Sequence, residues 1–498
     1  MLNPATSVLV ILFSLLAMTG LFLGPFAAAG LPIILSTPDA LFSSLFIFRY
    51  LRLIVHIASF LLYRPTPIPE NPSYSAADCT VIVPTVNPLD PDFNECITSI
   101  FAANPAAVFV ITAGYKKLRL AQRICAELSP KIKVLATKIA SKRDQLVLAI
   151  PKVQTKFTVL GDDHVFWPST RFLPTMLAPF EDPAVGCVGT NKRVRRFNNG
   201  FSKINFWNFI GCLYLERHNF EITATNNIDG GVFVISGRTV VHRTNILQDP
   251  AFLSGFTNER FFFGKFGPLN ADDDNFITRW EVSKGWKIRV QNCPDATIET
   301  TLGTWPKFGD QCLRWVRTTW RSNSASLFTD RTIWRSQPWC VYAVYISSFF
   351  NFALFTDASL LKLLGQSSYA SRLTFLLLIL WIIASKAVKI IPHFLRNPRD
   401  LVWFPGQIAF GYIHSLYKLY AGLTFYNCVW GGRNLSEDPD TPEQEQAIDD
   451  ANAAIDIDSG YVSKAASSID LHGKQLLDLT AVDIRSRSRS TIRSDDEE

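Results

Sequence analysis

The stretch that decides the fold is FTVLGDD, Phe157 to Asp163. Its first four residues are apolar or β-branched, as in a strand buried within a parallel sheet, and it ends on two carboxylates. Two earlier runs have the same character, CTVIVPTV from Cys79 and AAVFVITAG from Ala106. Helical stretches such as KKLRLAQRICAELS lie between these runs. The alternation predicts an α/β domain built on a doubly wound sheet.

Asp162 and Asp163 directly follow the predicted strand. In a doubly wound sheet, ligands bind at the carboxyl ends of the strands, so both acids are well placed for chemistry. Paired carboxylates suit a divalent cation that bridges to a diphosphate, because Mg²⁺ and Mn²⁺ prefer oxygen ligands. An Asp-rich turn or a helix cap would use the same residues, and the motif alone leaves both interpretations open.

A second group of acids, Asp272 to Asp274, lies in NADDDNFITRW ahead of a predicted helix. Three adjacent carboxylates repel one another, so at least one should have a raised pKa unless a cation is near. A carboxylate with a raised pKa can act as a general base toward a hydroxyl group. The alternative is an acidic helix N-terminus that is stabilised by the helix dipole.

Arginine and tryptophan are concentrated in FGDQCLRWVRTTWRSN, which contains QCLRW from Gln311 to Trp315. Arginine offers a fork of donors to phosphates, and tryptophan offers a flat face to a sugar ring. The same composition is typical of a helix at a membrane interface. The two interpretations are compatible with one helix.

The composition is apolar for a soluble enzyme, with 48% hydrophobic residues among 498. The formal net charge of +6 is mild, and we expect no nucleic-acid partner. Nine cysteines show no CxxC pairs, which indicates neither a zinc site nor a disulfide framework. This pattern fits a reduced protein that faces the cytosol.

Several apolar segments predict membrane association. The stretch from Met1 to Pro38 carries no charge and is long enough for a transmembrane helix. The run from Leu41 to Tyr63 contains Arg49 and Arg52, so it either spans with its arginines facing protein or lies at the interface; the sequence favours spanning.

Two further spans are predicted at Trp339 to Thr356 and at Leu373 to Ser385, joined by an outer loop. Their basic flanks predict that both ends lie in the cytosol. The region from Leu401 to Val429 contains polar residues and predicts an interfacial or re-entrant element.

These patterns divide the chain into five regions. Residues 1–63 form an N-terminal transmembrane region and residues 64–304 a cytosolic α/β domain. Residues 305–337 form an amphipathic interfacial segment, and residues 338–433 a C-terminal transmembrane or interfacial region. Residues 434–498, which are acidic at first and later rich in Arg-Ser, are expected to be a disordered cytosolic tail.

The order of strand with acids, acid cluster, QxxRW and apolar helices resembles that of membrane-embedded family 2 glycosyltransferases. The chain is similar to hyaluronan, chitin and cellulose synthases, and most of all to the fungal type 2 glycosyltransferases, from about Val81 to Arg433. The resemblance implies a GT-A-like domain embedded between N- and C-terminal transmembrane helices. It also implies an integral protein of the plasma membrane with its catalytic domain and C-terminal tail in the cytosol.

The resemblance implies roles for the acids. GDDH resembles the DxD metal motif, which makes Asp163 the ligand of Mn²⁺ or Mg²⁺ and Asp162 an accessory substrate-binding residue. ADDDNFITR resembles the GDDRHLTNR run of hyaluronan synthases, which makes Asp273 the catalytic base with Asp272 beside it. ITAG, Ile111 to Gly114, lacks the acidic nucleotide-binding residue that the family usually has there.

Other segments resemble substrate-binding motifs of the family. SKRDQ is similar to its GKR segment, ISGRTVVHR to its SGP segment, QCLRW to Q(Q/R)xRW and WGGR to its WGTR gating motif. The substrate-binding residues that these similarities imply are Lys142, Arg143, Ser236, Gly237, Gln311, Arg314, Trp315, Trp430 and Arg433.

The function implied is a processive, inverting transferase that uses a UDP-sugar to polymerise and export a cell-surface or cell-wall polysaccharide. Its partners are then the UDP-sugar donor, the growing polysaccharide acceptor and the lipid bilayer. The alternative is a non-processive enzyme with a lipid acceptor, similar to a ceramide glucosyltransferase. A transporter or scaffold without catalysis leaves the α/β block unexplained. The sequence indicates neither the sugar transferred nor the oligomeric state.

Overall fold

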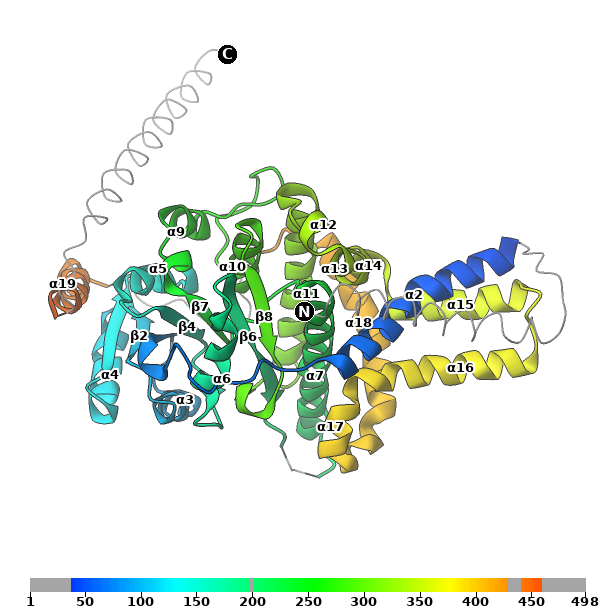
Figure 1. Cartoon of the computed structure of the whole chain (residues 1–498), viewed down its shortest axis with the longest axis horizontal. Coiled ribbons are helices and arrows are strands. Elements are labelled where there is room, and N and C mark those ends of the chain that lie inside the picture. Colours follow the sequence, from blue (N-terminus) through cyan, green and yellow to red (C-terminus); the bar gives the residue numbers. More distant parts are fainter. Residues whose placement is uncertain (1–36, 198–199, 429–439, 459–498) are drawn as a thin grey trace, which may run out of the picture.

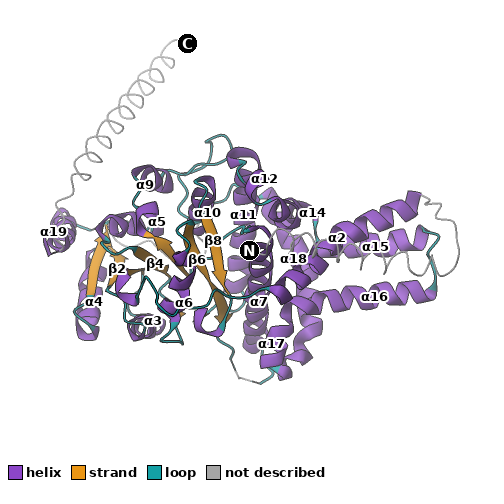
Figure 2. Cartoon of the chain, in the orientation of Figure 1, coloured by secondary structure: helices purple, strands orange, loops and turns teal. Residues whose placement is uncertain are grey.

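The computed structural model describes residues 37–197, 200–428 and 440–458, and these form a mixed α/β sheet with helices around it (Figures 1 and 2). Neighbouring strands follow the order β3-β2-β1-β4-β7-β6-β9-β5, and β8 pairs with β6. The strands are β1 Cys79–Pro84, β2 Ala107–Ala113, β3 Ile132–Thr137, β4 Phe157–Gly161, β5 Val165–Phe166, β6 Val185–Val194, β7 Thr239–Arg243, β8 Lys287–Gln291 and β9 Thr297–Thr300.

The three predicted strands are confirmed as β1, β2 and β4. Strand β1 lies between β2 and β4 and is parallel to both, and β3 continues the parallel half. Strand β7 runs antiparallel between β4 and β6. The parallel connections pass through helices α3 Pro91–Ala102, α4 Tyr115–Leu128 and α5 Lys142–Ala149. The carboxyl ends of β1, β2 and β4 therefore meet at one edge of the sheet.

Helices cover both faces of the sheet, as expected for strands buried on both sides (Figure 2). Val81 and Val83 pack on one face with Phe93 of α3, whereas Ile82 packs on the other with Leu146 of α5. Other described helices are α6 Phe172–Leu177, α7 Lys203–Asp229, α8 Thr244–Leu247, α9 Pro250–Thr257, α10 Asp273–Ser283, α11 Lys307–Ser324, α12 Ile333–Ser336, α13 Pro338–Cys340, α14 Ser347–Phe350 and α17 Ile391–Arg396.

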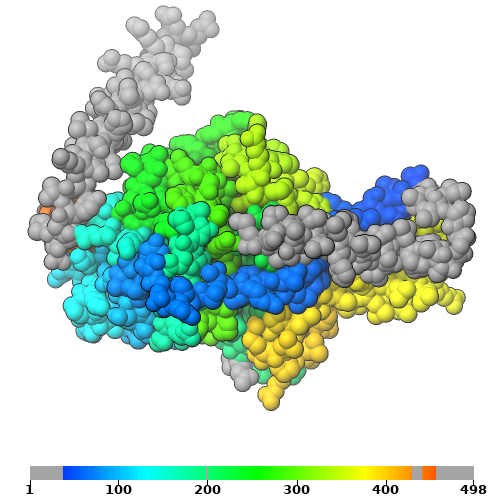
Figure 3. All heavy atoms as spheres, viewed as in Figure 1, coloured from blue at the N-terminus to red at the C-terminus, as the bar shows by residue number. Residues whose placement is uncertain are grey.

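Two described helices are long and apolar enough to cross a membrane, α2 Thr37–Leu62 and the helix Arg372–Arg396, which begins with α16 Arg372–Ala387. They project from the body that holds the sheet (Figures 1 and 3). Within α2 the two arginines face protein, because Arg49 pairs with Asp357 at 2.7 Å and Arg52 donates to the carbonyl of Ala343 at 2.9 Å. The predicted span from Met1 to Pro38 lies almost wholly outside the described residues.

The predicted span from Trp339 to Thr356 is not one straight helix. The helices Pro338–Phe350 and Ala353–Gln366 (α15) meet at an angle of 86°, and a third span arises only if this bent pair is counted as one. At the bend, Lys418 donates to the carbonyl of Asn351 at 3.2 Å and Arg49 donates to its side chain. These contacts occupy polar groups at the point where the helix breaks, so they stabilise the bend.

The region predicted as interfacial or re-entrant forms one helix, α18 Phe404–Leu423. Its length of 20 residues would suffice, but it is less apolar than α2 and Arg372–Arg396 and is not among the candidate spans. It packs along α11 and α15 on the side of the sheet from which the apolar helices project (Figure 1).

Part of the predicted disordered tail is a helix, α19 Pro442–Asp458, which packs beside α4 and β3 (Figure 1). Ile448 is 1% exposed, and the Asn452 amide donates to the carbonyl of Ala136 at 2.9 Å and accepts from its N–H at 3.1 Å. Strand β3 lies at the edge of the sheet, so its free backbone groups gain partners from this contact. The acidic composition of this segment predicted disorder, but its apolar residues, Ile448 among them, pack against the sheet and cover this edge. The tail from residue 459 lies outside the described residues.

Candidate active site

A cavity of about 750 Å³ opens at the carboxyl edge of the parallel strands. Its walls come from the ends of β1 and β4, from α5, from the loop before β7, and from the N-termini of α10 and α11. Ten of the predicted site residues line it, namely Lys142, Asp162, Asp163, Ser236, Gly237, Asp272, Asp273, Gln311, Arg314 and Trp315. Trp430 and Arg433 lie outside the described residues.

Lys142 joins the two groups of acids. Its Nζ lies 2.8 Å from Asp162 Oδ1 and 2.9 Å from Asp273 Oδ2. Burial alone would lower the pKa of Lys142, but attraction by the two carboxylates outweighs it and holds that pKa well above its ordinary value. For Asp162, burial opposes ionisation, and attraction by Lys142 still brings its pKa below the ordinary value. The residues predicted from separate motifs therefore form one ionic cluster.

Asp163 lies deeper, with 6% of its surface exposed. Its Oδ2 accepts from Thr85 Oγ1 at 2.8 Å, and its Oδ1 lies 3.0 Å from His164 Nδ1. The Asp163 carboxylate lines the cavity beside that of Asp162. Together with Asp162, the residue offers the hard oxygen ligands that Mg²⁺ and Mn²⁺ prefer, and the side chains present fit such a cation.

The three consecutive acids have different partners. Asp272 has a left-handed backbone at φ 64°, and Arg321 of α11 holds its carboxylate with two donors, at 2.7 and 3.0 Å. Asp274 accepts from the backbone N–H of Gly237 at 3.1 Å. Burial and then repulsion by Asp273 raise the pKa of Asp274 to about 6, as the spacing of the acids predicted. Asp273 is the acid of the three that contacts Lys142.

Gly237 permits this close approach. A Cβ at position 237 would lie 3.3 Å from the Cβ of Asp274, 3.4 Å from Asp273 Oδ2 and 3.4 Å from Lys142 Nζ. Any larger side chain would therefore press on the ionic cluster from the loop before β7.

One face of α11 turns toward the acids. Gln311 accepts from the backbone N–H of Gly303 at 3.2 Å, which fixes the loop before the helix. The Trp315 ring lies 5.1 Å from the Tyr214 ring, and the Arg238 guanidinium lies 5.5 Å from the centroid of Trp315. An aromatic face flanked by a cation is suited to a sugar that is bound next to charged groups.

Arg143 does not line the cavity. It is 1% exposed and donates to Glu259 at 2.6 Å, to the carbonyl of Phe256 at 2.5 Å and to the carbonyl of Ala271 at 2.7 Å. Because Ala271 directly precedes the acid cluster, Arg143 holds the loop that positions the acids. The structure thus separates Arg143 from Lys142, although the two are neighbours in sequence.

Sequence reasoning missed three residues of this site. Arg238 directly follows Ser236 and Gly237 in the segment ISGRTVVHR. The resemblance of that segment assigned roles to Ser236 and Gly237 but none to the side chain of Arg238. Thr85 ends the first predicted strand and reaches Asp163 only across the sheet. Arg321 lies on the same helix as Gln311, but nothing in the local sequence identifies Asp272 as its partner.

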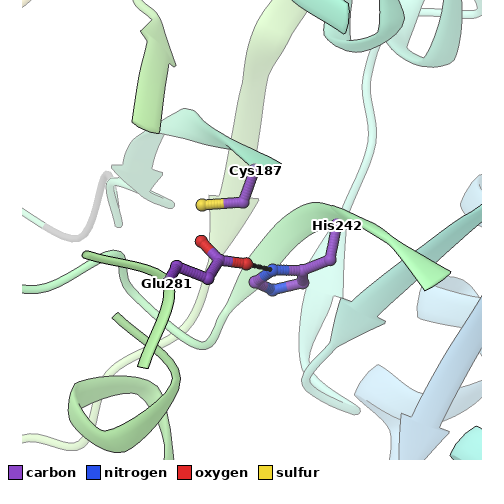
Figure 4. Close-up of side chains that lie close together, drawn as sticks. All are labelled: Cys187, His242 and Glu281. Carbon is purple, nitrogen blue, oxygen red and sulfur yellow. Dashed lines mark hydrogen bonds and ion pairs between the residues drawn. The ribbon is translucent and has the colours of Figure 1, made fainter. Parts of the chain in front are cut away.

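A separate buried group lies between the sheet and α10. Cys187 of β6, His242 of β7 and Glu281 of α10 point toward one another (Figure 4), and all their potential ligand atoms lie within 4.8 Å. His242 Nδ1 lies 2.7 Å from Glu281 Oε1. Within the described part of the chain, these three side chains form a cluster that could hold a metal ion. The cluster is separate from the metal site predicted at Asp163. Its hydrogen bond ties α10, and with it Asp273, to β7.

Residues 76–318 match the family described as glycosyltransferase like family 2. A protein of Gibberella zeae named type 2 glycosyltransferase is 42% identical over 402 residues, which cover 79% of this chain and 75% of that protein. One of the same name from Pyricularia oryzae is 42% identical over 405 residues, covering 80% and 83%. A solved structure, the mannosyltransferase PcManGT from Pyrobaculum calidifontis in complex with GDP-Man and Mn²⁺, has a TM-score of 0.49 at 16% identity, covering 78% of this chain and 97% of that one.

Proposed function

Because the chain belongs to the family 2 glycosyltransferases, we propose that it is a processive, inverting enzyme that extends and exports a cell-surface or cell-wall polysaccharide from a UDP-sugar. The observation that carries the proposal is the contact of Lys142 with both Asp162 and Asp273 in one cavity. That cavity also holds the QxxRW residues Gln311, Arg314 and Trp315.

The proposed reaction is a single displacement at the anomeric carbon. Asp273 removes the proton from the acceptor hydroxyl, and the hydroxyl oxygen forms the new bond to the anomeric carbon. The bond from that carbon to the diphosphate oxygen breaks, and UDP leaves with the electron pair. Lys142 contacts the carboxylate of Asp273 and holds it in place before the acceptor arrives, while Asp272 is held by Arg321 and serves to position the loop.

The leaving diphosphate is neutralised by cations of this chain. Lys142 and Arg314 line the cavity near the acids, and Arg433 is assigned to the same role from its motif. A divalent cation, Mn²⁺ or Mg²⁺, held by Asp163 with Asp162 beside it, would supply further positive charge when bound.

The acceptor is placed by α11 and by the loop before β7. Trp315, backed by Tyr214 and Arg238, offers its face to the acceptor sugar. Ser236 and Gly237 line the opposite wall of the same cavity, and we assign them and Gln311 to substrate binding. Trp430 is assigned to the gating segment on its motif alone.

We place the enzyme in the plasma membrane with three spans, which are α2, the bent helix pair Pro338–Phe350 and Ala353–Gln366 counted as one, and the helix Arg372–Arg396. The α/β domain and the C-terminal tail lie in the cytosol, where UDP-sugars are made. In this arrangement the cavity opens to the cytosol at the acids and continues toward the apolar helices, which suits a product that leaves across the bilayer.

The test is UDP release by purified protein with a panel of UDP-sugars, followed by measurement of product length. Release with one sugar and a product of many units supports the proposal. A single sugar on a lipid would replace it with the non-processive alternative, and absence of UDP release with every sugar would contradict both.

A further inference from the structure

The cavity does not end at the acids. It continues past Trp315 to a region between α2, α7, α16 and α18, in the part of the molecule that carries the apolar helices. Six cationic side chains line that end, which we call the cationic chamber: Arg49, Arg52, Arg217, Lys386, Lys389 and Lys418. The proposed transfer step uses none of them.

The acids beside the chamber balance only part of this charge. Asp357 pairs with Arg49 and Lys386, and Glu221 pairs with Lys389. Over the described ranges, no ion pair reaches the other three cations, Arg52, Arg217 and Lys418. The chamber is therefore positively charged in the absence of a ligand.

The three unbalanced cations lie near one another. Arg52 donates to the carbonyl of Ala343 at 2.9 Å and to Ser347 Oγ at 2.6 Å, and Lys418 donates only to a carbonyl. Arg217 is exposed to the cavity and has no partner in the part of the chain that the structure describes. Burial, and then repulsion by Arg52 and Arg217, lower the pKa of Lys418 to about 7. An anion in the chamber would favour the charged form of Lys418 and offset the repulsion among the three cations.

The rest of the lining shows what kind of anion fits. Hydroxyl and amide groups of Ser347, Ser348, Asn351, Gln407 and Ser415 face the same space. Two buried ring nitrogens in this wall, His218 Nδ1 and His414 Nε2, have no partner among the described residues. Apolar side chains such as Leu53, Leu215 and Val344 share this lining and can pack on the faces of sugar rings, while the sugar hydroxyls match these donors and acceptors.

We infer that the cationic chamber binds the acceptor glycan beyond its reacting sugar, and that this glycan carries anionic groups, either carboxylate or phosphate. The inference rests on the proposed function, because the acceptor reaches the chamber through the cavity that holds Asp273. The unbalanced cations of the chamber favour an anionic product over a neutral one. A neutral glycan would leave Arg52, Arg217 and Lys418 without a counter-charge.

The test measures binding of three tetrasaccharides that share one backbone to the full chain in detergent. The probes are cellotetraose and the forms that carry carboxylate or phosphate at C6. We expect a charged form to bind at least about tenfold more tightly than the neutral one, since hydrogen bonds to charged groups contribute about 1.5–3 kcal/mol. The preference should shrink between about 50 and about 500 mM NaCl, since salt screens the attraction. The stronger of the two charged forms identifies the anionic group.

The matched variants are Arg217→Gln, Lys418→Gln and the double variant, with Arg119→Gln on the exposed face of α4 as the control. Arg217→Gln removes no hydrogen bond or ion pair to a described residue. Lys418→Gln loses the hydrogen bond to the carbonyl of Asn351 but relieves repulsion by Arg52 and Arg217, so we expect melting temperatures close to that of the parent for both variants. The double variant should lose at least about tenfold in affinity for the charged probe, and the control should lose nothing.

Equal binding of all three probes, or binding of none, overturns the inference. Binding of dodecyl phosphate in place of the charged glycans would assign the chamber to a lipid headgroup and overturn it as well. Donor turnover by the unaltered protein is measured separately. A failed transferase assay then counts against the proposed function, and a failed binding assay counts against the chamber.

Discussion

The ammonium group of Lys142 lies 2.9 Å from a carboxylate oxygen of Asp273. Lys142 begins α5 and Asp273 begins α10, so the contact depends on the sheet that places both helix ends at one edge. The same ammonium group reaches Asp162, which follows β4. The candidate base and Asp162, the neighbour of the candidate metal ligand, therefore share one counter-charge, and substitutions on either side have distinct expected effects.

Asp273→Asn should lower sugar transfer by about a thousandfold, because the acceptor hydroxyl loses its base. Binding of the UDP-sugar should persist, since the amide keeps the size of the side chain. The measurement is turnover of a radiolabelled donor together with donor affinity by calorimetry. Asp295→Asn, at a half-exposed position outside the cavity, is the control. Activity near that of the parent would move the role of base to Asp272 or Asp274.

Asp163→Ala should abolish the dependence of transfer on Mn²⁺ or Mg²⁺ along with most of the activity, because the diphosphate charge is no longer offset at this position. The parent protein should lose activity in excess EDTA and regain it when Mn²⁺ is added. The measurement is a metal titration of UDP release for both proteins. Full turnover of the parent in EDTA would contradict the assignment of a metal to Asp163.

Arg321→Met should destabilise the protein by about 3 kcal/mol, because it leaves Asp272 as a buried carboxylate without its counter-charge. Asp272 is 7% exposed, so water cannot replace the lost partner. Adding Asp272→Asn to Arg321→Met should restore much of the stability. Denaturant unfolding of the two single variants and the double variant measures the coupling. A simple sum of the two single effects would show that the pair is not coupled.

Asp274→Asn should raise the free energy of unfolding at neutral pH by about 1 kcal/mol, because the charged carboxylate is disfavoured in the folded chain. Solvent in the cavity screens the charge and keeps the effect small. The pKa of Asp274 is raised from 3.8 to about 6, so the folded chain binds this proton more tightly than the unfolded chain. The carboxyl group therefore favours folding most below pH 3.8, and that contribution is lost as the pH rises through about 6.

The difference in melting temperature between Asp274→Asn and the parent, measured from pH 4 to pH 8, checks this prediction. It should grow with pH and level off above about pH 7. The other charged groups that face Asp274 are Asp272, Asp273, Lys142, Lys192 and Arg238, and all five are unchanged in the variant. A difference independent of pH would show that the effect comes from packing.

The sequence predicted three of the four strands in the parallel half of the sheet, β1, β2 and β4, and the position of Asp162 and Asp163, because buried strands have a local signature and their carboxyl ends share one edge. It did not predict that Arg143 turns inward while Lys142 faces the cavity. That choice depends on Glu259 and the carbonyl of Ala271, which are distant in sequence.

Two further features depended on partners that no local pattern reveals. The break at Asn351 follows from contacts with Arg49 and Lys418, which come from other helices. The docking of α19 depends on an edge strand that is left open by the order of the sheet. In both cases the composition of the segment predicted a different structure, and tertiary contacts decided the outcome.

The pair formed by Asp272 and Arg321 bears on how relatives of this enzyme can be recombined. A chain cut after Thr304 would keep Asp272 to Asp274, the acid loop, but would lose α11, whose Arg321 neutralises Asp272. An isolated α/β fragment would therefore contain a buried carboxylate without its counter-charge. The same defect would arise in a chimera that joins the sheet of one relative to the α11 of another with a different residue at position 321. Inheritance of the acid loop and of α11 is therefore linked, and a substitution in one restricts which substitutions the other can accept.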